Sequence, residues 1–139
     1  MKIFFDNVDF SSTSGPNSFA RKLAKSLVEK GHQLVPDADV QLSFIFSSQK
    51  RAPIVQRLDG IYFNSEQDWR ALNEPIKKSY DDAKGVIFQS QFNKLLTEKY
   101  FGEKEKSVVI HNGTSLDEIE MIPPMTHPTL DSFEKVWCC

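Results

Sequence analysis

The sequence predicts an α/β domain in which a parallel, Rossmann-like sheet carries helices on both faces. Short apolar runs alternate along the chain with longer segments of helical periodicity, as in folds built from repeated strand and helix units. The runs are largely apolar, which indicates strands that are buried on both faces. A length of 139 residues suits a single core, and 40% hydrophobic residues indicate a folded chain.

The first predicted unit is a strand at residues 2–6, followed by a polar loop and a helix. Phe19, Leu23 and Leu27 recur at helical spacing after the loop, so they mark one face of this helix. Gly31 is expected to end it, because glycine readily adopts the left-handed conformation found at helix ends.

The middle of the chain predicts two more strands and a second helix. The strands are expected at residues 40–46 and 54–56, with proline-bearing turns beside them. Pro75 is expected just inside the start of the helix, where the missing proline N–H has no consequence, and Gly85 lies near its end.

The last predicted units continue this alternation. A strand at residues 86–88 leads to Ser90, which is expected to cap a third helix that stops at Gly102. A final strand is expected at residues 108–110. The apolar positions that mark the third helix are Phe92, Leu95, Leu96 and Tyr100.

Polar residues follow several of these strands, and in parallel sheets ligands bind beyond the carboxyl ends of the strands. Asp59, next to Arg57, could orient or polarise a sugar hydroxyl; the alternative is a surface ion pair beside a turn. We expect Asn112 to form a left-handed turn with the following glycine, and prefer this to His111 as a general base. The residues expected to line a cleft are Arg57, Gly60, Asn64, Gln89, Ser90, Asn112 and Gly113.

The loop that opens the first helix is a candidate anion site. Gly15, Pro16, Asn17 and Ser18 lie where backbone N–H groups and the positive end of a helix dipole attract phosphate or diphosphate. The alternative is an ordinary turn with Asn17 or Ser18 as the N-cap, since the loop lacks the G-x-G-x-x-G spacing.

Composition excludes several classes of function. A net charge of −2 gives no broad positive field, so no nucleic-acid partner is expected. No metal site is expected either, because His32, His111 and His127 show no ligand spacing with Cys138 and Cys139. The adjacent cysteines and the early polar residues of the N-terminus indicate a reduced, cytoplasmic environment.

Taken in order, four segments resemble the N-terminal domain of retaining GT-B glycosyltransferases of family 4. They are the loop, helix and strand entry at residues 15–35, Arg57-Leu58-Asp59-Gly60, the segment at residues 83–90, and Val109-Ile110-His111-Asn112-Gly113. The resemblance covers residues 1–113, and the order of the segments is more specific than any one of them.

The resemblance implies transfer of a sugar from a nucleotide-sugar donor to a sugar or lipid-linked acceptor, with retention at the anomeric carbon. This half would mostly bind the acceptor, with Asp59 as the catalytic residue and the Gly15 loop reaching the donor diphosphate. The donor would be held mainly by a C-terminal donor-binding domain, without a metal or cofactor. The full-length protein could then lie at the periphery of a membrane.

The end of the chain is expected to lie outside the first domain. We expect an acceptor-side domain at residues 1–114, a proline-bearing linker at 115–132, and the start of a truncated second domain at 133–139. The fragment alone is then expected to be inactive, and its apolar tail is expected either to self-associate through unpaired backbone groups or to be locally disordered.

A second interpretation is a stand-alone flavodoxin-like or receiver-like module, or a small ligand-binding protein. Asp6 and Asp9 after the first strand, together with Asp59, could form the phosphorylation site of a receiver. Magnesium-dependent labelling of Asp59 by acetyl phosphate would favour that interpretation.

Overall fold

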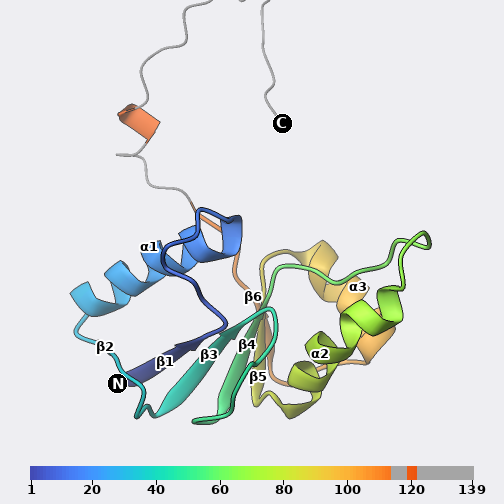
Figure 1. Ribbon diagram of the computed structural model, residues 1–139, viewed down its shortest axis with the longest axis horizontal. Coiled ribbons are helices and arrows are strands. Elements are labelled where there is room, and N and C mark those ends of the chain that lie inside the picture. The colour runs from blue at the N-terminus through green and yellow to red at the C-terminus, as the bar shows by residue number, and fades with distance from the viewer. Residues whose placement is uncertain (114–118, 122–139) are drawn as a thin grey trace, which may run out of the picture.

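A computed structural model describes residues 1–113 and 119–121. It confirms the predicted fold class, a parallel sheet of six strands with helices on both faces (Figure 1). The expectations for a linker at 115–132 and a second domain at 133–139 fall, except at 119–121, outside the described residues. The elements are β1 (Lys2–Asp6), α1 (Gly15–Glu29), β2 (Gln33–Leu34), β3 (Val40–Phe44), β4 (Ile54–Leu58), α2 (Trp69–Asp82), β5 (Gly85–Phe88), α3 (Gln91–Phe101) and β6 (Ser107–Val109).

The strand order is β2-β1-β3-β4-β5-β6, and every neighbouring pair is parallel. The chain moves outward from β1 to β2, returns to the other side of β1 at β3, and then continues in one direction to β6. The order of the strands therefore reverses between β1 and β3. Open α/β sheets bind ligands at such a switch point, beyond the carboxyl ends of the two strands.

The helices cover the two faces unequally. Helix α1 lies on one face, where the Phe19 ring packs 6.5 Å from that of Phe44, while α2 and α3 lie together on the other (Figure 1). Among the described helices, none is long and apolar enough to cross a membrane.

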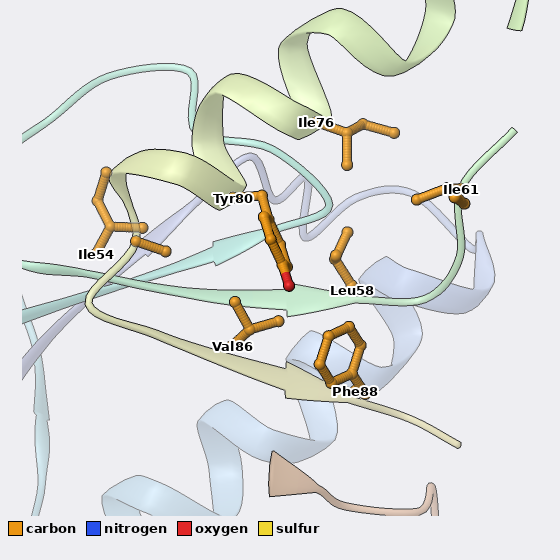
Figure 2. Close-up of a cluster of buried hydrophobic side chains, with 8 residues drawn as sticks. Ile54, Leu58, Ile61, Ile76, Tyr80, Val86 and Phe88 are labelled. Atoms are coloured by element: carbon orange, nitrogen blue, oxygen red, sulfur yellow. The ribbon is translucent and has the colours of Figure 1, made fainter. Parts of the chain in front are cut away.

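The main apolar core lies beneath α2. Ile76 and Tyr80 point from α2 toward β4 and β5, where they meet Leu58, Val86 and Phe88 (Figure 2). The Tyr80 hydroxyl donates a 2.8 Å hydrogen bond to the carbonyl of Gly102, so this large ring is buried with its polar atom satisfied. This cluster fixes β4 and β5, the two neighbouring strands on which the candidate site is built.

The same face is polar over β1 and β3. Gln41 is buried beneath the helix-free connection from β3 to β4, with its amide N–H groups donating to the Gln49 carbonyl at 2.6 Å and to Ser47 Oγ at 2.9 Å. Its Oε1 accepts a 2.8 Å bond from the backbone N–H of Arg51. Side-chain hydrogen bonds thus hold the β3–β4 connection against this part of the sheet, which no apolar helix face in the described chain covers.

Several predicted strand ends differ from the structure by one or two residues. Strand β3 ends at Phe44 rather than at residue 46, because Ile45 has a φ of 69° and turns the chain out of the sheet. Strand β4 continues to Leu58, and β6 covers Ser107–Val109 rather than residues 108–110. Arg57 therefore lies within a strand, and only Asp59 follows it.

The predicted start of the second helix at Pro75 is wrong, since α2 begins at Trp69. The side chain of Asp68 caps this earlier start by accepting a 3.2 Å bond from the N–H of Ala71. Pro75 lies inside the helix, where it has no backbone N–H to donate the usual helical hydrogen bond to the Ala71 carbonyl. The N-cap residue Asp68 therefore marks the start of α2 better than Pro75 does.

Both predicted ends of the third helix are confirmed. Ser90 Oγ accepts a 3.1 Å bond from the N–H of Asn93, and Gly102 ends the helix with a φ of 96°. However, Phe92 and Leu95 are 68% and 60% exposed. The helix instead buries Asn93, whose amide donates a 2.7 Å bond to the carbonyl of Leu58 at the end of β4.

Candidate functional site

The predicted strand-end residues meet at the carboxyl edge of the sheet, around Arg57. This side chain points to the α1 face, where its guanidinium lies 3.9 Å from the centre of the Phe19 ring. One guanidinium nitrogen forms an ion pair with Asp59, and another donates a 2.9 Å bond to Asn112 Oδ1. Arg57 is only 4% exposed, so it joins the end of β4 to the segment after β6 from within the protein.

Gln89 completes this network from the end of β5. Its Nε2 donates to the carbonyl of Asp59 at 2.5 Å, and its Oε1 accepts a 2.9 Å bond from Asn112 Nδ2. Hydrogen bonds therefore link residues that follow three consecutive strands. The sequence predicted these groups at one edge, and the structure places Arg57, Asp59, Gln89 and Asn112 in direct contact.

Asp59 is the reachable acidic group of the network. Its side chain is 22% exposed, against 5% for the Arg57 side chain that holds it. Burial raises the pKa of the Asp59 carboxyl above its usual value, and the adjacent Arg57 guanidinium opposes this effect. Asp59 is thus held in one orientation by a buried cation while its carboxyl remains accessible from solvent.

Other predicted cleft residues do not join this network. Ser90 acts as the N-cap of α3, and Asn64 closes a local turn by accepting a 2.9 Å bond from the N–H of Glu66. The left-handed turn expected at Asn112 is wrong, because neither it nor Gly113 has a positive φ. The Asn112 side chain is used instead for the contacts with Arg57 and Gln89. Gly60 is half-buried at the end of β4, and Gly113 is exposed.

The loop expected to bind an anion forms the first turn of α1. Gly15 and Pro16 begin the helix, and the N-cap residue Ser14 makes no side-chain capping bond. The backbone N–H groups of the first turn are therefore left without a side-chain cap. Asn17 and Ser18 lie inside the helix, so the alternative in which one of them is the N-cap is wrong.

The sequence did not reveal a hollow at the switch point between β1 and β3. It has a volume of about 400 Å³, and its lining includes Asn7 and Asp9 after β1, Asn17 from α1, and Gln49 from the β3–β4 connection. Asn7 has a φ of 60°, and its Nδ2 donates a 2.7 Å bond to the carbonyl of Phe44. This bond ties the ends of β1 and β3 together beside the hollow.

Asp6 forms the floor of the hollow and is almost fully buried. One of its carboxyl oxygens accepts bonds from Gln41 Nε2 at 2.9 Å, from Ser43 Oγ at 3.1 Å and from the Ser48 N–H at 2.9 Å. The other accepts a 2.5 Å bond from Ser48 Oγ. With this many donors already bound, Asp6 fixes the shape of the hollow and is not available to a ligand.

Among residues 1–113 and 119–121, no group of three His, Cys, Asp or Glu side chains could hold a metal ion. Comparison with known proteins adds no assignment, since no family model, curated protein or solved structure matches this chain.

Proposed function

We propose that this chain is the acceptor-side domain of a retaining GT-B glycosyltransferase. The observation that carries the proposal is the network at the carboxyl edge. Arg57 and Asp59 belong to one segment of the family resemblance, and Gln89 and Asn112 belong to two others; hydrogen bonds join all four residues at one site. Residues from different segments that meet at one place indicate a shared role, and chance surface contacts would not be expected to join them.

In this proposal Asp59 is the catalytic residue that contacts the reacting sugar. A carboxylate can accept hydrogen bonds from sugar hydroxyl groups and stabilise positive charge that develops at the sugar ring. Arg57 is a positioning residue, because its buried guanidinium holds both Asp59 and Asn112. Gln89 supports the same geometry through the Asp59 carbonyl.

The donor is proposed to be a nucleotide sugar held mainly by a second domain. On this domain, the uncapped first turn of α1 at residues 15–18 would face the diphosphate, since its N–H groups and helix dipole favour an anion. The acceptor would be a sugar or a lipid-linked sugar. No metal or cofactor is required in this scheme.

A transfer assay on the full gene product, with a panel of nucleotide sugars and saccharide acceptors, tests the proposal. Asp59→Asn should reduce transfer at least 100-fold, because it removes the acidic group while keeping a side chain of similar shape. Asp81→Asn is a matched control on the exposed surface of α2, and it should retain full activity. Equal activity of both variants, or no transfer by the unmodified protein, would contradict the proposal.

A receiver-like function is less well supported by the geometry. The strand order puts β3 between β1 and β4, so Asp6 and Asp59 follow strands that are not neighbours. Asp59 is also paired with Arg57, and Asp6 is occupied by its own donors. We therefore expect no labelling of Asp59 by acetyl phosphate and magnesium. Binding of a small ligand stays a second candidate function, favoured by the hollow at the switch point.

A further inference from the structure

From the groups that line the switch-point hollow, we infer that it binds a neutral saccharide through its hydroxyl groups and disfavours phosphate. The inference rests on the proposed function, and it names the chemistry of the acceptor and the place where it binds. Neither the predicted loop at residues 15–18 nor the Arg57 network accounts for this hollow.

The hollow combines suitable size with unused hydrogen-bonding groups. Its volume of about 400 Å³ lies in the range of small-molecule sites. Asn17 uses its Oδ1 to accept a 3.0 Å bond from the Asp9 N–H, which leaves its Nδ2 unbonded within the described chain. Gln49 uses its Oε1 to accept a 2.8 Å bond from Arg51 Nε, which leaves its Nε2 unbonded in the same sense. Two side-chain amide donors are therefore available at the hollow.

Acceptors lie beside these donors. Asn7 is held through its Nδ2, so its Oδ1 makes no bond to another described residue. Asp9 uses Oδ1 to accept bonds from both the N–H and the hydroxyl of Ser11, and its Oδ2 is likewise unbonded in residues 1–113 and 119–121. A hydroxyl group both donates and accepts, so a ligand with several hydroxyl groups can pair with donors and acceptors in this arrangement.

Charge separates a saccharide from a phosphate. The described lining includes Asp6 and Asp9 but neither lysine nor arginine. Inorganic phosphate is an anion at neutral pH, and in this hollow it would lie beside the Asp9 carboxylate with no lysine or arginine in the described lining to offset the repulsion. Phe5 and Val8 add apolar surface that suits the C–H groups of a sugar ring. The uncapped N-terminal turn of α1 shares only Asn17 with this lining, and phosphate can bind there through backbone N–H groups.

Side-chain amide NMR signals give a readout specific to the hollow. The 139-residue chain, labelled with ¹⁵N, is titrated with the methyl glycosides of glucose, galactose, mannose and N-acetylglucosamine, and separately with inorganic phosphate. At least one glycoside should shift the NH₂ signals of Asn17 and Gln49. Phosphate should leave the Gln49 signal in place, whatever it does to Asn17 and to the backbone N–H of Gly15, because those two residues belong to the first turn of α1.

Two variants remove the donors and keep the existing structural bonds. Asn17→Asp and Gln49→Glu replace each donor nitrogen with oxygen, while Oδ1 and Oε1 still accept from Asp9 and Arg51. Each should weaken glycoside binding about tenfold, as expected for a lost hydrogen bond. Gln91→Glu makes the same change at an exposed position at the start of α3, and it should leave the affinity unchanged.

The outcomes distinguish this inference from the proposed function. If a glycoside shifts NMR signals only in another part of the carboxyl edge, the hollow is not the binding site. That result would still support an acceptor-binding domain. Phosphate that shifts the Asn17 and Gln49 amide signals more than every glycoside would overturn the ligand class. If no glycoside binds anywhere, the inference is wrong, and the transfer assay on the full gene product then decides the proposed function independently.

Discussion

Two halves of one sheet face are covered in different ways in this domain. Over β4 and β5, helix α2 buries apolar side chains such as Tyr80 against Leu58 and Phe88 (Figure 2). Over β1 and β3, a short connection is held by hydrogen bonds to Gln41 and Asp6. The apolar half supplies rigidity, and the polar half leaves a hollow with hydrogen-bonding groups at the switch point. The apolar core cluster and the proposed binding site thus lie on neighbouring parts of the same sheet.

The largest expected effect comes from breaking the apolar half. Phe88→Ala would leave a cavity beneath α2, because Phe88 is fully buried in the core cluster. The free energy of unfolding should fall by about 3–5 kcal/mol. Urea unfolding followed by circular dichroism measures this loss. A loss below about 1 kcal/mol would mean that this cluster is not the main source of stability.

A smaller loss is expected from breaking the polar half. Asp6→Ala leaves the hydroxyl groups of Ser43 and Ser48 without their acceptor and removes one of the acceptors of Gln41, and it should cost about 2–3 kcal/mol. Asp6→Asn retains one acceptor oxygen and should cost less. The same urea unfolding measurement applies to both variants. If Asp6→Ala were as stable as the parent protein, the polar network would not hold the connection.

The smallest effect on the free energy of unfolding at neutral pH is expected from removing the Tyr80 hydroxyl group. Tyr80→Phe loses only the bond to the Gly102 carbonyl and should cost about 1 kcal/mol. Its pH dependence is the sharper measurement. Burial, together with the nearby acids Glu98 and Asp81, raises the pKa of Tyr80 to about 12, whereas an unfolded tyrosine ionises near pH 10.

The direction of the pH effect follows from proton binding. Between about pH 10 and 12 the folded protein keeps the Tyr80 proton and the unfolded chain loses it, so stability falls as pH rises through this window. Tyr80→Phe should make the fall less steep in urea unfolding measured across that range. An identical slope for both proteins would show that Tyr80 ionises at its ordinary pKa.

The sequence predicted the fold class and most elements because strong local signals agree with the tertiary structure. Gly31 and Gly102 end helices with positive φ angles, and Ser90 caps α3. Where two local signals competed, the prediction was wrong, as at Pro75, because the capping bond of Asp68 starts α2 six residues earlier. The left-handed conformation of Ile45 had no sequence signal, since isoleucine rarely adopts it.

The candidate site was predicted only in part. The rule that functional groups follow parallel strands was sufficient to bring Arg57, Asp59 and Asn112 together. The hollow depends on the strand order, which places Asn7 next to Gln49 although they are far apart in sequence. One signal was present: β3 reads Val-Gln-Leu-Ser-Phe, and its alternation indicates a polar covering on one face.

Hydrogen exchange on the full gene product tests directly whether ligands bind at the carboxyl edge of the sheet. Exchange is compared with and without a nucleotide sugar and a saccharide acceptor. We expect slower exchange at residues 6–9, 15–18, 57–60 and 111–113, and unchanged exchange at the opposite edge, near residues 33–40. Protection confined to that opposite edge, or to the outer surfaces of α2 and α3, would contradict binding at the carboxyl edge.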